Sequence, residues 1–311
     1  MMVPLLQSLQ GKQTDHGISM ERLYRYAGIS RQGFHQAVVR LGEDRGMFHE
    51  IERLVNEYRE DKDRRAGSRS LFYNLNIKSR FNIGVNKFEQ MLSANGLSLM
   101  PLRIRVVTTK SSMQSWNYSN LVNGLTINDI NQVVVGDLTY VYLGSSKQYL
   151  FCLTDVYSSR MVGYHIGDSM RAVDANTALV KWKKLRGKKN IKGSIHHSDG
   201  GSQYFSALYL GELHRLRVRV SCAENCLRNG YAEQRNGLIK HHLIPTIKMG
   251  SLHELDKEME RIMYIYNYER KQEKLGWLSP VEFEEKISKM DKKPELNLYK
   301  FKNPWYGFFE A

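Results

Sequence analysis

The chain has 311 residues, 41% of them hydrophobic, so it can bury the cores of two or three domains and is not disordered. Lysine and arginine number 46 against 32 acidic residues, and the formal charge of +14 favours nucleic acid or an acidic membrane face as partner. No segment approaches the roughly 20 apolar residues of a membrane span. The N-terminus has no signal-peptide pattern, and three cysteines form no disulfide framework, so we expect a cytoplasmic nucleic-acid-binding protein.

The positive charge lies in the first 250 residues. Residues 1–120 carry a net +7, residues 121–250 carry +8, and residues 251–311 carry −1. We therefore expect the polyanion to lie against the first two of these segments.

Residues 1–45 have the outline of a helix-turn-helix DNA-binding module. Residues 20–27 have helical spacing, Gly28-Ile29-Ser30 predicts a turn, and Ser30 is a good N-cap for a second helix over residues 31–40. Arg31 is then a candidate DNA contact at the start of the second helix. A plain helical hairpin fits these residues about as well.

Residues 46–97 predict a second small helical DNA-binding module. Its helices are expected over residues 48–58, 68–75 and 84–93, and Asn95-Gly96 predicts the end of the last one.

Residues 98–130 have the composition of a linker. Arg103 and Arg105 are placed to follow a phosphate backbone if this segment is extended. A solvated connector is the alternative interpretation.

Residues 131–250 predict a mixed α/β layer, the candidate catalytic core. Three strands are expected in an antiparallel meander, and helices and strands then alternate. The meander strands are residues 133–135, which lead into Asp137, and residues 149–154 and 161–166. The later elements are helices 174–185, 206–213 and from 232 onward, with strands at 193–197 and 217–220.

Residues 251–311 predict a helical C-terminal region. A helix is expected from residue 253 to about 268 and a short one over 281–287, which Ser279-Pro280 would open. The aromatic end, residues 304–309, is a candidate contact between protomers.

Asp137, Asp199 and Glu233 are the candidate catalytic residues. Two carboxylates beside strands and a third on a helix can converge on a pair of hard divalent cations, which take oxygen ligands and clamp the oxygens of a phosphoryl transfer. Each residue alone has a structural alternative: a turn cap for Asp137, an Asx-turn for Asp199 and a solvated helix position for Glu233. All three in this order favour a metal site.

The segments around these residues resemble those of insertion-sequence transposases with a retroviral-integrase-like core. The segments are Gln132–Tyr140, Leu153–Gly163, His196–Tyr204 and Ala232–Lys240. The similarity is greatest to the OrfB-type proteins of the IS-three family. The C-terminal signature of that family is also resembled here, by Tyr266-Asn267 and Leu278–Phe283. The likeness spans about residues 20–285.

The resemblance implies a ribonuclease-H-like core with Asp137, Asp199 and Glu233 as a DDE triad that binds two Mg²⁺ ions, for which Mn²⁺ would substitute. It implies cleavage of transposon ends followed by strand transfer into target DNA. It also makes an upstream OrfA-type partner plausible.

Four more residues are candidate DNA contacts. Lys240 lies about two helical turns after Glu233, where it can touch a terminal phosphate. Gln203 and His197 lie close to Asp199 in sequence, and Lys184 belongs to a run of basic residues from 181 to 189. A solvated side chain is the alternative for both lysines.

We therefore predict a bacterial DNA transposase of the DDE type. Because paired DNA ends need coordinated transfer, we expect a homodimer or a higher multimer on double-stranded DNA. The alternatives are a transposase-derived DNA-binding regulator without activity, and a nuclease of the same fold that cleaves but does not join.

Overall fold

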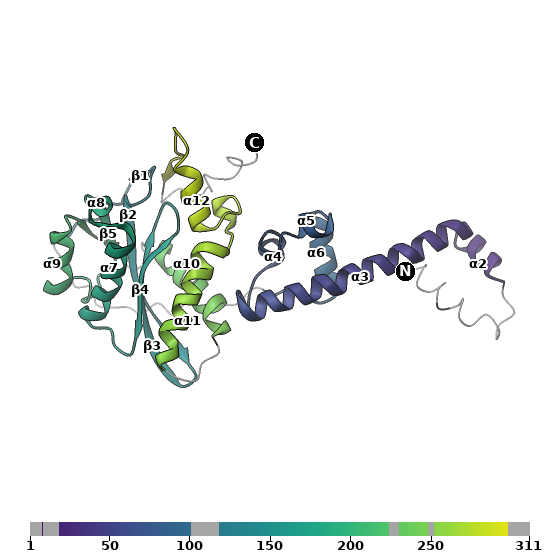
Figure 1. The fold of residues 1–311 in the computed structure, drawn as a ribbon, viewed down its shortest axis with the longest axis horizontal. Helices are drawn as coiled ribbons and strands as arrows, with labels where there is room; N and C mark the ends of the chain where they lie inside the picture. Colours follow the sequence, from purple (N-terminus) through teal and green to yellow (C-terminus); the bar gives the residue numbers. More distant parts are fainter. Residues whose placement is uncertain (1–7, 9–18, 101–117, 224–229, 248–251, 298–311) are drawn as a thin grey trace.

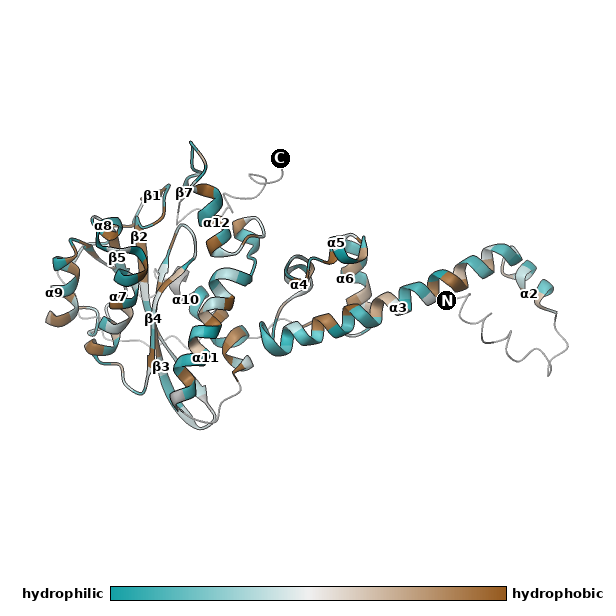
Figure 2. Ribbon diagram, viewed as in Figure 1, coloured by the Kyte–Doolittle hydropathy of each residue, from teal (hydrophilic) through white to brown (hydrophobic). Residues whose placement is uncertain are grey.

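The computed structural model describes residues 8, 19–100, 118–223, 230–247 and 252–297. A central β-sheet with helices on both faces forms one end of the molecule, and a long helix projects away from it (Figure 1). Apolar residues are concentrated in the central strands of the sheet (Figure 2). Within the described residues, no helix is long and apolar enough to cross a membrane.

The sheet has five strands in the order β4-β3-β2-β5-β6. β2 (Val133–Leu143), β3 (Ser146–Asp155) and β4 (Met161–Gly167) form the predicted antiparallel meander, which is confirmed. β5 (Ile195–Ser198) and β6 (Arg219–Cys222) extend the sheet in parallel with β2.

β2 is longer than predicted, and Asp137 lies in its interior instead of at its end. The strand continues because residues 138–143 pair with β3 across a two-residue hairpin loop. Gly144 in that loop has a φ of +61°, which glycine adopts without strain.

Helices cover both faces of the sheet. α7 (Ala172–Arg186), α8 (Lys188–Ile191) and α9 (Ala207–Arg215) lie on one face, and α10 (Gly230–Leu238), α11 (Leu252–Tyr264) and α12 (Pro280–Ile287) lie on the other (Figure 1). Successive residues of β3 alternate between the two cores: Phe151 and Leu153 pack with α7, and Leu150 and Cys152 pack with α11. This mixed architecture is the predicted ribonuclease-H-like α/β fold.

The N-terminal helices agree with the prediction as far as the Ser30 cap and differ from it after that. α2 (Met20–Tyr26) ends before Gly28, whose φ is +66°, and the Ser30 hydroxyl caps the next helix by accepting from the Gly33 amide at 2.9 Å. That helix, α3 (Arg31–Asp61), runs without a break through the segment that we expected to separate two modules. The predicted domain boundary at residue 45 therefore lies inside one helix. Glycine in a helix interior costs only about 1 kcal/mol relative to alanine, so Gly42 and Gly46 do not break it.

The second half of α3 belongs to a small helical unit. α4 (Ser68–Asn74), α5 (Ile77–Phe81) and α6 (Val85–Ala94) pack against it, and α5 was not predicted. The buried core of this unit is shared by all four helices; it includes Ile51 and Val55 of α3, Leu71 of α4, Ile77 of α5, and Phe88 and Leu92 of α6. The predicted end of the last helix at Asn95-Gly96 is confirmed.

The segments that we expected to be linker and tail are partly integrated into the sheet domain. Val122 and Ile127 are buried with Phe283 of α12 in one apolar cluster, and β1 (Thr126–Ile127) pairs with β7 (Leu296–Asn297). α11 packs its apolar face on the sheet. The described part of the C-terminal region thus completes the core. Residues 304–309 lie outside the described residues.

Candidate active site

Asp137 lies on β2, and Asp199 directly follows the neighbouring parallel strand β5. The register of β2 and β5 pairs Gly136 with Ser198, so the next residue of each strand is one of the two aspartates. Adjacent strands are about 4.8 Å apart, which places the two backbone positions side by side. The structure therefore brings together two residues that are far apart in sequence.

The carboxylate of Asp137 is held by a residue of α10. Asp137 is 9% exposed, and the Asn236 amide donates to its Oδ2 at 2.7 Å. Asn236 is itself 3% exposed, so the hydrogen bond forms in a site from which most water is excluded. The carboxylate is an acceptor with a fixed orientation, as a metal ligand or a reaction centre requires.

Glu233 lies on the same helix, one turn before Asn236. α10 contacts β2, and residues three apart on an α-helix share a face. The backbone of Glu233 is therefore on the face of α10 that meets Asp137. Its side chain lies outside the described residues.

Asp199 follows β5 in a tight turn. Burial raises the pKa of this carboxyl above its ordinary value, and the amide of Gly201, which donates to Oδ1 at 3.1 Å, lowers it in part. A side chain at position 201 would collide with the Gln203 amide and with the Asp199 carboxylate. Gln203 therefore lies beside the carboxylate, as its proximity in sequence suggested.

His197 does not lie where a DNA contact requires it. The ring is 2% exposed, and Nδ1 is 2.9 Å from the Ser221 hydroxyl on β6. Burial lowers its pKa to about 4, so the ring is neutral near pH 7. The expected contact of His197 with DNA is wrong for this arrangement, because the side chains of a parallel strand covered on both faces point into the protein. Tyr204 is also buried, in the core beneath the site.

Lys240 lies beyond α10, in the π-helix η2 (Ile239–Leu243). Its Nζ is 4.2 Å from the centroid of the Tyr140 ring, and Lys147 Nζ is 4.8 Å from the same ring. Tyr140 is exposed on β2, three residues after Asp137, and its ring contacts both cations. Sequence reasoning missed Tyr140, Lys147 and Asn236. The spacing of Asn236 from Glu233, one helical turn, is the signal that points to it.

The remaining predicted DNA contacts lie on other elements or outside the described residues. Arg31 is exposed at the first position of α3, and Arg103 and Arg105 lie outside the described residues. Lys184 is exposed on α7, whereas Arg186, in the same basic run, forms a buried ion pair with Glu284.

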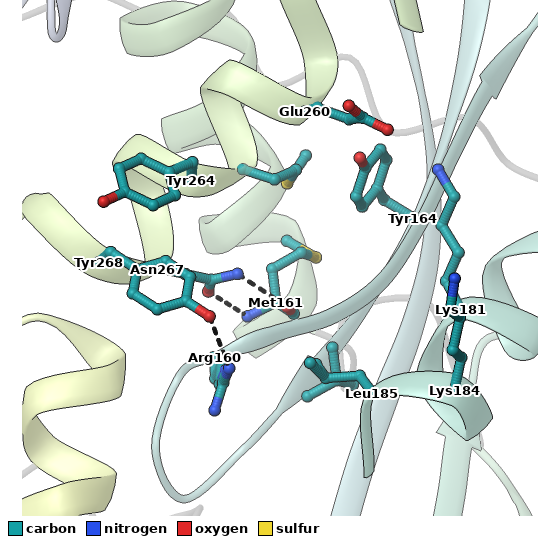
Figure 3. Close-up of a pocket in the computed structure, with 12 residues that line it drawn as sticks. Arg160, Met161, Tyr164, Lys181, Lys184, Leu185, Glu260, Tyr264, Asn267 and Tyr268 are labelled. Atoms are coloured by element: carbon teal, nitrogen blue, oxygen red, sulfur yellow. Dashed lines mark hydrogen bonds between the residues drawn. The ribbon is translucent and has the colours of Figure 1, made fainter. Parts of the chain in front are cut away.

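Lys184 lines a cavity of about 510 Å³ between β4, α7 and α11. Figure 3 shows Lys181 and Lys184 on one side of it, with Tyr264 and Tyr268 on the other. The two tyrosine rings are stacked, with centroids 4.9 Å apart. This cavity is separate from the paired aspartates.

Where side chains are described, no group of three histidine, cysteine, aspartate or glutamate residues converges on a metal position. The described donors at the site are the two aspartates. Glu233, the third predicted ligand, lies on α10.

Comparison with known proteins agrees with this geometry. Residues 128–226 match the family described as the integrase core domain. A 31 kDa protein of insertion element IS600 from Shigella sonnei is 30% identical over 268 residues, which cover 85% of this chain and 97% of that protein. The transposase InsF of insertion sequence IS3A from Escherichia coli K12 is 31% identical over 166 residues; the match covers 50% of this chain and 54% of InsF.

Among solved structures, the catalytic core domain of the HTLV-2 integrase in complex with magnesium is similar, with a TM-score of 0.40 and 16% sequence identity. The match covers 50% of this chain and 96% of that domain. The relative of IS600 is matched over almost its whole length, and the integrase-core family covers the strands that carry both aspartates. The chain therefore belongs to the insertion-sequence transposases with an integrase core, a family of nucleic-acid-processing enzymes of DNA transposition.

Proposed function

We propose that the protein cleaves transposon ends and joins them to target DNA at a site formed by Asp137, Asp199 and Glu233. The observation that carries the proposal is the parallel register of β2 and β5, which sets the backbone positions of the two aspartates side by side, next to the contact of β2 with α10. Three carboxylates on two strands and a helix are a suitable ligand set for phosphoryl transfer that depends on divalent cations.

The donor set fits two Mg²⁺ ions, with Mn²⁺ as a substitute. Carboxylate oxygens are the ligands that these hard cations prefer. Burial raises the pKa of Asp199, and no described cation offsets that effect, so a positive charge at this position would stabilise the ionised form. When bound, such ions polarise the phosphate and lower the pKa of an attacking water or DNA 3′-hydroxyl.

The surrounding residues have distinct tasks in this proposal. Asn236 fixes the orientation of the Asp137 carboxylate, and the Gly201 amide does the same for Asp199. Lys240 binds a phosphate of the DNA end, for which it would leave the ring of Tyr140. Gln203, beside Asp199, contacts the DNA next to the reacting phosphate.

The DNA itself is held by the basic parts of the chain. The excess positive charge lies in the first 250 residues. The helical pair that binds double-stranded DNA consists of α2 and the start of α3, which includes Arg31. Arg103, Arg105 and Lys184 are further proposed contacts. We also propose a dimer or higher multimer on DNA, an OrfA-type partner and action in the bacterial cytoplasm.

A strand-transfer assay tests the proposal. Purified protein is incubated with Mg²⁺, Mn²⁺ or EDTA and with labelled double-stranded DNA from the region that flanks the gene, together with a target plasmid. We expect joined product with either metal and none with EDTA. Asp137→Asn, Asp199→Asn and Glu233→Gln should each reduce the rate by on the order of a thousandfold.

Asp168→Asn is the matched control, because Asp168 is an exposed acidic residue away from the paired strands. It should leave the rate unchanged. Nicking without joining in the parent protein would identify a nuclease, and DNA binding without either reaction would identify a regulator. Both outcomes would overturn the proposal.

A further inference from the structure

The helical unit formed by the second half of α3 with α4, α5 and α6 is attached to the sheet domain at the helix that carries the candidate active site. The segment after α3 lies against η2 and α11, and Figure 1 shows this end of α3 beside α11. The amide of Arg64 donates to the carbonyl of His242 in η2 at 3.0 Å, and Arg261 of α11 donates to the carbonyl of Asp61 at 2.7 Å.

Asp63 is the centre of this contact. Its side chain is fully buried, with Oδ1 2.9 Å from His242 Nδ1 and Oδ2 accepting from Arg270 Nε at 2.9 Å. Burial raises the pKa of Asp63, but the hydrogen bond with His242 and the charge of Arg270 outweigh it, so that the net pKa is below the ordinary value. The carboxylate is therefore ionised at neutral pH and joins three segments of the chain.

A second contact lies next to it. The rings of Tyr73, at the end of α4, and Trp277 are stacked with centroids 4.1 Å apart, and the Asn74 side chain accepts from the Lys271 amide at 2.9 Å. The same turn of residues 270–278 reaches α10, because the Arg235 guanidinium donates to Gln272 at 2.8 Å. The helical unit therefore meets α10 indirectly as well as through η2.

α10 and η2 form one continuous helical segment, held on different sides. Asn236 binds Asp137 of the sheet, and His242, six residues later, binds Asp63 of the helical unit. At about 100° per residue, six positions rotate the side chain well away from the face that meets the sheet. The π-helical stretch begins three residues after Asn236 and contains His242, and π-helical turns of this kind are frequent at functional sites.

We propose that Asp63 is a positioning residue, through which the helical unit holds η2, with Lys240, and so sets α10, with Glu233, against the paired aspartates. The inference rests on the proposed function. It assigns to the helical unit a task in the reaction, besides any contact with DNA. A displacement of a catalytic group by about 1 Å can cost a hundredfold in rate, so this attachment has a measurable effect on turnover.

The test compares Asp63→Asn with the parent protein in three measurements. These are amide hydrogen exchange over residues 238–247 in the free protein, the maximal rate of DNA-end cleavage at saturating DNA, and the affinity for the DNA end. We expect faster exchange in that segment, a maximal rate lower by about ten- to hundredfold, and an affinity changed less than about twofold.

Asp44→Asn is the matched control within the same helical unit. Asp44 forms an exposed ion pair with Lys87 at 2.9 Å and has no contact with η2, so its loss should change none of the three quantities. Because Asp63 is fully buried, His242→Ala provides a second variant at a partly exposed position of the same contact. The double variant Asp63→Asn/His242→Ala should be no slower than the slower single variant, since each single variant already disrupts the contact between Asp63 and His242.

Unchanged exchange over residues 238–247 in both single variants would overturn the proposal. A loss that appears only in the affinity for DNA would do so as well. If the parent protein cleaves no DNA, the proposed function fails, whereas the exchange measurement still decides whether Asp63 holds η2.

Discussion

Replacement of His196 by glutamine should make the folded protein less sensitive to acid. The imidazole is 1% exposed, and its Nε2 is 2.9 Å from the Tyr209 hydroxyl. Burial, with a smaller contribution from His197, lowers the pKa of His196 to about 3. A glutamine amide can still meet the Tyr209 hydroxyl but does not titrate, so the variant removes the proton equilibrium and keeps the contact.

The sign and size follow from proton linkage. A histidine in the unfolded chain has a pKa near 6.5, so between pH 6.5 and about 3 the unfolded chain binds a proton that the folded protein does not. The stabilisation from neutral His196 is therefore fully present above pH 6.5 and is lost as the pH falls. Between pH 7 and pH 5 this loss amounts to about 2 kcal/mol.

The assay is urea unfolding of the parent and His196→Gln at pH 7 and at pH 5. At pH 7 the parent should be more stable, and at pH 5 its advantage should be smaller by about 2 kcal/mol. Tyr209→Phe is the control: it removes the hydroxyl but keeps the buried imidazole, so its difference from the parent should be equal at both pH values. An advantage of the parent that is the same at pH 5 as at pH 7 would refute the reasoning, because it would mean that the folded protein protonates His196 as readily as the unfolded chain.

Three further substitutions test the packing and the site. Glu284→Gln removes the charge that two buried arginines share, and should lower the free energy of unfolding by about 3–5 kcal/mol in urea titration; a loss below about 1 kcal/mol would contradict it. Gly163→Ala places a methyl group against a backbone carbonyl of α7 and should cost about 1–3 kcal/mol in thermal unfolding, whereas Gly167→Ala, in the same strand, meets only a movable histidine ring and should cost less. Asn236→Ala should slow DNA-end cleavage about ten- to hundredfold, because the Asp137 carboxylate loses its hydrogen-bond donor, and an unchanged rate would show that the orientation of that carboxylate is unimportant.

Local patterns predicted most of the sheet domain. Alternating apolar runs with glycine and serine between them identified the meander, and the run before Asp199 identified β5. These predictions succeeded because the period of a strand and the residues of a tight turn are properties of neighbouring residues. The continuity of α3 was not predicted: residues 31–40 and 48–58 were expected to form helices of separate modules, and only the structure shows that one helix includes both.

The sequence by itself determined the fold class, the family and the identity of the three candidate carboxylates, because these depend on motifs and on the order of elements. The tertiary structure alone decided that Asp137 and Asp199 are adjacent, that His197 points inward, and that Asn236 holds Asp137. It also decided the contact between Asp63 and His242, which are 179 positions apart. Contacts of this kind form between segments that only the packed chain brings together, and no local pattern of charge or hydrophobicity encodes which partner a buried carboxylate will meet.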